Sequence, residues 1–133
     1  MLLPAGTTVA VADGEKLVLL RNTGGDALKL TAQPTPSLSG DNKSGGAHHG
    51  SSAANPDDSR LEEDSFAAAT AAWLNREVQA GRIADLVVVA PAKPLGELRK
   101  HYHKTLEAKL VGELSKDLVN SSIPEIEQVL QAA

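Results

Sequence analysis

Hydrophobic positions in the first third of the chain fall into short runs that are separated by turn residues. A β-branched and apolar run over 7–12 is followed by Asp13-Gly14, and a second apolar run covers 17–20. Two such runs around an Asp-Gly pair are typical of a β-hairpin. After a second turn at 22–26, apolar and polar residues alternate over 28–33, which is the period of a strand with one face in water. The pattern therefore predicts a meander of three strands.

The pattern changes to helical spacing after residue 58. Ser59 and Glu62 form a capping box, which predicts that a helix begins at Ser59. Gly81 is the expected C-terminal stop. Between them, apolar residues at helical spacing predict a buried stripe, made of Ala67, Ala71, Leu74 and Val78.

The rest of the chain alternates between strand and helix patterns. The continuous apolar run over 85–90 predicts a strand buried on both faces. A helix from Pro94 to about His103 or one turn beyond follows, and 109–114 is a candidate strand. Strand, helix and strand in this order form a βαβ unit, which implies a parallel pair and a right-handed crossover. A second capping box at Ser122 opens a last helix.

Together these elements predict one α/β domain over residues 1–133. A chain of 133 residues fits a single domain with a core of its own. The expected fold is a mixed β-sheet flanked by helices, in the order β-β-β-loop-α-β-α-β-α. The loop, residues 34–58, is rich in Gly, Pro and Ser. A loop this long in a compact domain is usually functional or disordered.

Composition narrows the classes of partner. The net charge is −4, aromatic residues make up 2% of the chain, and no basic block is present, so there is no strong nucleic-acid footprint. The chain has no cysteine, which excludes disulfides and cysteine-based zinc sites in it. We find no signal peptide and no apolar segment of membrane length. We therefore expect a bacterial, cytoplasmic protein without a membrane partner, and the sequence leaves its oligomeric state open.

The long loop carries the first candidate chemistry. Adjacent glycines let a backbone adopt positive φ and approach a ligand closely, and histidines can bind metal or move protons near neutral pH. The candidate catalytic residues that this loop chemistry indicates are Gly45, Gly46, His48 and His49, and a resemblance described below adds Ala47. Lys43, in the same loop, is a candidate binding residue. The alternative is a mobile surface loop whose histidines are exposed by chance.

The helix pattern over 95–104 carries the second candidate. Glu97 and His101 are four residues apart and share a helix face, and so do Arg99 and His103. We predict Arg99, His101 and His103 as binding residues. The commoner interpretation is a solvated helix face with ion pairs between neighbouring turns.

A metal site is a weaker hypothesis. Its ligands would be His48, His49, Glu97 and His101. No spacing in the chain matches a ligand motif such as H-E-x-x-H. The chain also lacks a P-loop, a dinucleotide fingerprint and a G-x-S-x-G elbow, and we expect no cofactor.

Asp13 is the last candidate binding residue. A carboxylate at the end of a strand can serve in catalysis. An Asp-Gly pair, however, is what a tight turn favours. The turn interpretation of Asp13 is therefore preferred.

Ordered blocks of sequence carry a resemblance to a known family. The blocks are Val11-Ala12-Asp13-Gly14-Glu15-Lys16, Asn55-Pro56-Asp57-Asp58, Glu63-Asp64-Ser65-Phe66-Ala67, Leu95-Gly96-Glu97-Leu98-Arg99-Lys100 and Lys116-Asp117-Leu118. They span essentially the whole chain and resemble the bacterial host attachment protein family ("protein required for attachment to host cells"). That resemblance implies a role in bacterial adhesion to a host. Because the chain shows no export signal, an indirect role from inside the cell is easier to reconcile with the sequence.

The chain also resembles the middle domain of archaeal and eukaryotic peptide chain release factors. In that domain a β-meander leads into a loop with a Gly-Gly-Gln motif and then into a helix, and Gly45-Gly46 have the corresponding place here. The resemblance implies that the glycines let the loop enter the peptidyl transferase centre, where the Gln amide stabilises an oxyanion and its side chain positions water. Ala47 stands in place of that Gln. It keeps an N–H donor but has no side-chain amide, so faithful stop-codon termination is not expected.

The sequence leaves three functional hypotheses. The first is a non-enzymatic interaction protein of the host attachment family, with the Gly/His loop as the surface that contacts a protein partner. The second is a ribosome-associated hydrolase or rescue factor, which uses Gly45-Gly46-Ala47 to approach peptidyl-tRNA. The third is a metal-dependent hydrolase.

Overall fold

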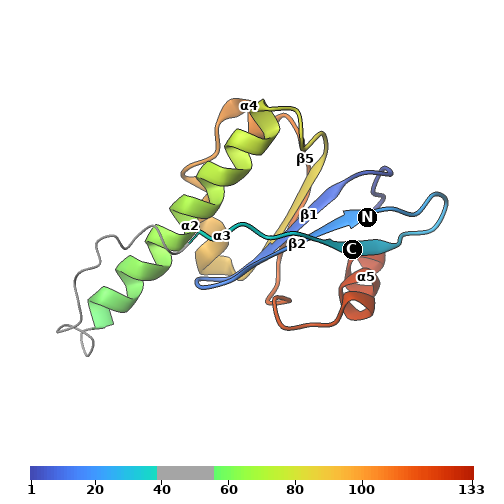
Figure 1. The fold of residues 1–133 in the computed structure, drawn as a ribbon. Coiled ribbons are helices and arrows are strands. Elements are labelled where there is room, and N and C mark those ends of the chain that lie inside the picture. The colour runs from blue at the N-terminus through green and yellow to red at the C-terminus, as the bar shows by residue number, and fades with distance from the viewer. Residues whose placement is uncertain (39–55) are drawn as a thin grey trace.

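A mixed five-stranded sheet forms the centre of the structure, with the strand order β3-β2-β1-β4-β5 and helices on both faces (Figure 1). This structure is a computed structural model that describes residues 1–38 and 56–133, with 56–60 described by their backbone alone. The predicted α/β fold class, the mixed sheet and the element order are confirmed. One short helix, α4, was not predicted.

The strands form a meander joined to a parallel extension. β1 (Thr8–Ala12), β2 (Leu17–Asn22) and β3 (Leu30–Gln33) pair antiparallel in sequence order. β4 (Leu86–Ala90) pairs parallel with β1 on one side and with β5 (Leu110–Ser115) on the other. The predicted meander and the predicted parallel βαβ pair are both present.

Two layers of helix cover the two faces of the sheet. α2 (Pro56–Gln79), α3 (Ala92–Arg99) and the short α4 (Lys104–Glu107) lie over one face. α5 (Ile123–Ala132) covers the opposite face (Figure 1). In the described part of the chain, no helix combines the length and the apolar character needed to cross a bilayer.

The alternation of side chains along each central strand supplies both cores. Ala10 and Ala12 of β1 belong to the core under α2, whereas Val9 and Val11 belong to the core under α5. All of β4 is fully buried, as the continuous apolar run predicted, because the strand lies between covered faces and between two neighbouring strands. β3 follows the predicted alternation only in part. Ala32 is exposed because β3 forms an edge of the sheet.

Helix α2 begins earlier than the capping box indicated. The prediction of Ser59 as N-cap is wrong, since the helix starts at Pro56. A proline fits the first helical turn because its missing N–H has no partner there in any helix. At the other end, Gly81 adopts φ 81°, a left-handed conformation that terminates helices, as predicted. The predicted apolar stripe of α2 is buried.

Helix α3 ends earlier than predicted. It stops at Arg99 rather than near His103, and α4 follows as a separate turn. The cause is the side chain of Asn75, which hydrogen-bonds the backbone of the intervening residues at His101 and His103. In the last helix, by contrast, the Ser122–Glu125 capping box forms as predicted.

Leu74 offers a test of the core under α2. Leu74→Ala is expected to lower the free energy of unfolding by about 2–5 kcal/mol, because it leaves a cavity in packed surroundings. Leu74 is 0% exposed, whereas Leu61 of the same helix is 61% exposed. Leu61→Ala is the matched control, with an expected change within about 0.5 kcal/mol. Urea denaturation measures both, and equal losses would contradict this account of the core.

Candidate functional site

Helix α2 is longer than the sheet on which it packs. Its 24 residues span about 36 Å, whereas a strand of 6 residues such as β2 spans about 20 Å. The described residues at 61–63 are exposed, and burial begins at Phe66. Figure 1 shows the N-terminal end of α2 reaching beyond the sheet. This projecting end is the one that continues from residues 39–55.

The candidate residues of the long loop fall outside the described residues. They are Lys43, Gly45, Gly46, Ala47, His48 and His49. The structure places the flanks of that segment. Leu38 is buried in the core under α2, and Pro56 opens α2.

Asp13 lies in the β1–β2 turn beside α2. Its Oδ1 accepts hydrogen bonds from the backbone N–H groups of Glu15 and Lys16, both at 2.7 Å. The neighbouring Gly14 packs against the helix, since a Cβ there would stand 2.8 Å from Cγ of Glu63. These contacts fit the turn interpretation of Asp13, and its role as a binding residue stays a prediction.

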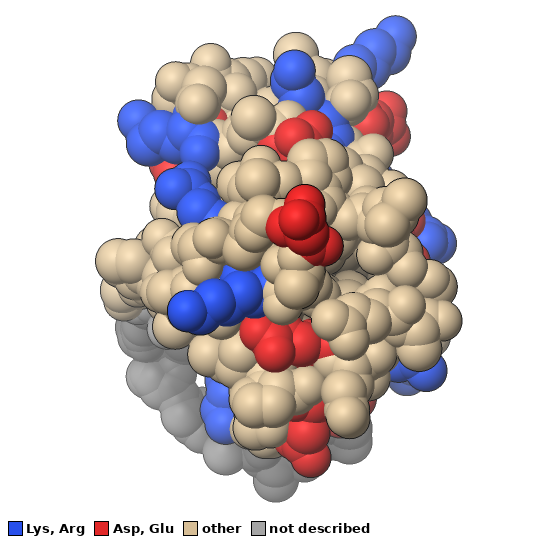
Figure 2. Space-filling view, turned by 90° about the vertical axis from the view of Figure 1, so that its right-hand side faces the viewer, with Lys and Arg blue, Asp and Glu red and all other residues tan. Residues whose placement is uncertain are grey.

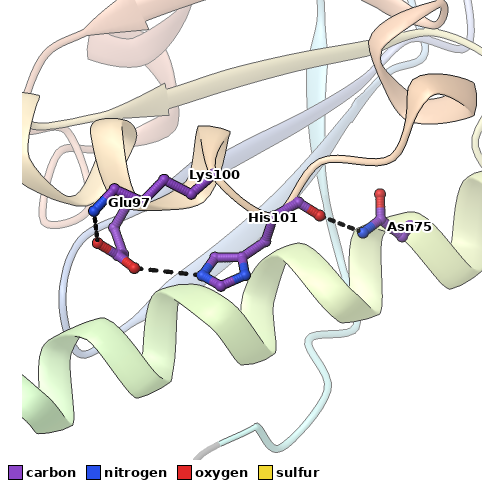
Figure 3. Close-up of polar contacts among 4 residues, drawn as sticks. All are labelled: Asn75, Glu97, Lys100 and His101. Carbon is purple, nitrogen blue, oxygen red and sulfur yellow. Dashed lines mark hydrogen bonds and ion pairs between the residues drawn. The ribbon is translucent and has the colours of Figure 1, made fainter.

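Glu97 and His101 come together near the end of α3, as their spacing predicts. His101 Nε2 lies 3.3 Å from Glu97 Oε2, and Lys100 Nζ lies 3.1 Å from Glu97 Oε1 (Figure 3). The hydrogen bond from Lys100, with a smaller effect of His101, holds the pKa of Glu97 below its usual range, although desolvation opposes this. Each oxygen of the Glu97 carboxylate therefore already has a partner, Lys100 on one and His101 on the other.

Arg99 and His103 do not share a helix face, so this prediction is wrong. Because α3 ends at Arg99, the two side chains diverge. Arg99 Nη2 pairs with Glu113 of β5 at 2.9 Å, whereas His103 Nδ1 lies 3.1 Å from Gln79 Nε2 of α2.

The phenol of Tyr102 lies close to the Arg99–Glu113 pair. Burial, with the neighbouring Glu113 carboxylate, raises the pKa of Tyr102 well above its usual range. Within residues 1–38 and 56–133, the Tyr102 hydroxyl and Glu113 Oε2 are buried without a hydrogen-bond partner. The phenol therefore stays neutral over the physiological pH range.

Asn75 is the organising residue that the sequence analysis missed. Its side chain is buried in α2, at 3% exposure. Its Nδ2 donates to the carbonyl oxygen of His101 at 2.9 Å, and its Oδ1 accepts from the N–H of His103 at 3.0 Å. Figure 3 shows the Asn75 amide facing the His101 carbonyl. The sequence did contain a signal for it, because a polar residue stands four positions after Ala71, next to the apolar stripe of α2.

These contacts frame a pocket between α2 and the α3–α4 connection. Its volume is about 270 Å³, and it is lined by two alanines of α2 and by Asn75, Arg76, Gln79, His101 and His103. The structure thus brings both predicted histidines of this region to one place. In the described ranges, no group of three His, Asp or Glu side chains could hold a metal ion, and His48 and His49 lie outside those ranges.

Charge is unevenly distributed along the chain. Residues 56–64 contain five acidic side chains and one basic. Residues 76–116 contain eight Lys and Arg against five Asp and Glu. On the face drawn in Figure 2, the described Lys and Arg side chains are interspersed with Asp and Glu and form no continuous basic surface.

Removal of the Asn75 amide tests its role in holding the α3–α4 connection. Asn75→Ala is expected to cost about 1–3 kcal/mol of folding free energy, because two backbone groups lose their partners. Hydrogen exchange at the His103 amide is expected to accelerate, since that N–H is donated to Asn75. Glu62→Ala, at an exposed position of the same helix far from His103, is the control. An unchanged exchange rate of the His103 amide in Asn75→Ala would contradict the role of Asn75 in holding the α3–α4 connection.

The pKa of Glu97 gives a second test of this region. Lys100→Gln is expected to raise it toward its usual value, because the largest cause of the depression is removed. Carboxyl NMR titration measures the change, with Lys104→Gln as a control that leaves Glu97 unaffected. Because the folded pKa is depressed, the stabilisation from this carboxylate is present above its unfolded pKa and is lost as pH falls through the folded one. An equal rise of the Glu97 pKa in both variants would contradict the assignment of the depression to the hydrogen bond from Lys100.

The comparisons with known proteins bear on the whole domain. The family model described as "Bacterial archaeo-eukaryotic release factor family 12" matches residues 6–130. No curated protein matches the chain. The matched range includes all five strands, α2, α3, α4 and α5 as far as Leu130, together with the connection between β3 and α2. The release-factor resemblance of the sequence is therefore confirmed at the level of the family, and the chain belongs to bacterial archaeo-eukaryotic release factor family 12.

Proposed function

We propose that this chain is a non-enzymatic interaction module that presents residues 39–55 to a protein partner from the projecting end of α2. The observation that carries the proposal is the length of α2. The helix extends past the sheet, and its first described side chains, at 61–63, are exposed. The exposed end of α2 is therefore accessible to a partner. In the release factors that the chain resembles, the corresponding connection bears the functional motif.

The charge of the projecting end favours a protein partner over RNA. Five acidic residues and one basic residue occupy 56–64. Nucleic-acid interfaces need positive side chains to neutralise phosphates, so an acidic end is repelled by RNA. A protein partner with a basic surface is attracted by the same charges.

The composition of the connection supports a binding role rather than hydrolysis. Ala47 stands where the release-factor motif has Gln, so no side-chain amide is present there to position a water molecule. We further propose that the chain acts in the cytoplasm. The role in attachment to host cells, which the sequence resemblance implies, would then be indirect and would pass through the protein partner.

A second candidate is a ribosome-associated release or rescue factor that acts on peptidyl-tRNA. Its support is the family match over residues 6–130. Gly45-Gly46 would let the backbone enter a narrow site, and the N–H of Ala47 would supply an oxyanion donor. This candidate requires binding to RNA despite the acidic end of α2.

Deletion of residues 43–52 tests both functions. The tagged chain of residues 1–133 is used as bait for proteins and, separately, for co-sedimentation with ribosomes at low salt. The interaction proposal expects a specific protein partner that the deletion loses while the melting temperature is kept. A partner retained by the deletion variant would place the contact surface elsewhere. Peptidyl-tRNA hydrolysis that Gly46→Pro abolishes would instead establish the second candidate.

Charge reversal at Glu62 separates the two candidates by the sign of the effect. Glu62 is exposed on α2. Glu62→Lys is expected to weaken binding of the protein partner several-fold, because long-range attraction to a basic surface is reduced. Ribosome co-sedimentation would strengthen in the same variant. The isosteric Glu62→Gln is expected to give an intermediate effect, and unchanged partner binding in Glu62→Lys would exclude an electrostatic role for this end.

A further inference from the structure

A pocket lies on the C-terminal half of α2, away from the end that continues from residues 39–55. Its α2 residues start at Ala68, 12 positions after the helix begins at Pro56, which places it about 18 Å along the helix axis. Small side chains, Ala68 and Ala72, form part of the lining. The pocket is therefore distinct from the surface invoked above, and an inference about it stands independently of the proposed function.

We propose that this pocket binds a phosphate group. The polar side chains that line it are those of Asn75, Arg76, Gln79, His101 and His103, and no carboxylate is among the lining residues. Arginine, imidazole and amide N–H groups are donors to anionic oxygens. The volume of about 270 Å³ is several times the roughly 30 Å³ occupied by a water molecule, so the pocket has room for a tetrahedral anion.

Arg76 is the main source of positive charge in the pocket. The neighbouring carboxylate, Glu77, is engaged by Arg82 through hydrogen bonds of 2.9 and 2.8 Å. Within residues 1–38 and 56–133, Arg76 makes no salt bridge. Its guanidinium is therefore available to pair with a phosphate, and the planar group suits two-point contact with phosphate oxygens.

The two histidines are held in place by contacts with residues of α2 and α3. Asn75 fixes the backbone at His101 and His103. The amide of Gln79 lies 3.1 Å from His103 Nδ1, and when it donates there, the proton of the neutral ring is on Nε2, which becomes a donor. His101 Nε2 lies 3.3 Å from Glu97 Oε2 (Figure 3), a contact that orients the ring and occupies this nitrogen. Donors that are already oriented bind an anion at lower entropic cost.

NMR titration of the full chain with inorganic phosphate tests the proposal, in a buffer without other multivalent anions. Saturable shifts are expected at the backbone amides around Arg76 and His103. Arg76→Gln is expected to weaken binding at least about tenfold, because a charge-assisted contact is lost. His103→Gln is expected to weaken it less. Lys93→Gln removes the same charge at an exposed position of α3 outside the pocket and is expected to leave the affinity unchanged.

Two results would overturn the proposal. One is a set of non-saturable shifts spread over all basic residues. The other is an equal loss of affinity in Arg76→Gln and Lys93→Gln, which would indicate a general charge effect. Melting temperatures of the variants show whether a loss of binding reflects misfolding, and His103→Gln provides a second variant if Arg76→Gln is unstable.

A second titration identifies the source of the phosphate. A short RNA oligonucleotide that shifts the same amides, with the same dependence on Arg76, assigns the pocket to a nucleic-acid backbone. Shifts at these amides with inorganic phosphate but not with RNA assign it to a small phosphate ligand. Both results support a phosphate site. If neither inorganic phosphate nor RNA produces saturable shifts, the proposal is refuted.

Discussion

The difference in length between α2 and the sheet determines how this molecule is organised. A helix of 24 residues packs on strands of at most 6 residues, so only part of it can be buried. The buried part, from Phe66 onward, stabilises the domain by covering β1 and β4. The remainder projects beyond the sheet. One helix thus supplies the main packing surface, the attachment point of residues 39–55 and one wall of the pocket.

Asn75 shows how a single polar side chain inside a packed helix can define a site. A buried amide without partners is costly, and the backbone at His101 and His103 satisfies both ends of this one. The same bonds interrupt the helical path after Arg99 and turn the chain toward β5. Consequently one residue of α2 determines where α3 ends, where the short α4 begins and where both histidines lie.

The sequence was informative where a local signal had no competing signal beside it. The Ser122 capping box, Gly81 and the apolar run of β4 each act over a few positions, and each was found as predicted. Contacts between distant segments were not predictable in this way. Nothing near His103 in the sequence indicates that Asn75 and Gln79 lie beside it. The start of α2 was misplaced because Pro56 and Ser59 are both valid start signals, and local pattern does not rank them.

The charges along α2 also follow the helix dipole, which favours acidic residues near the N-terminus and basic ones near the C-terminus. That effect falls off within one turn, so it explains neither the acidic residues at 62–64 nor the histidines outside the helix. Because α2 starts at Pro56, residues 62–64 lie beyond its first turn. Arg76 lies in its last turn, but His101 and His103 reach the same pocket from another segment. Convergence of donors from separate elements, rather than the charge of one helix, is therefore the stronger argument for an anionic ligand.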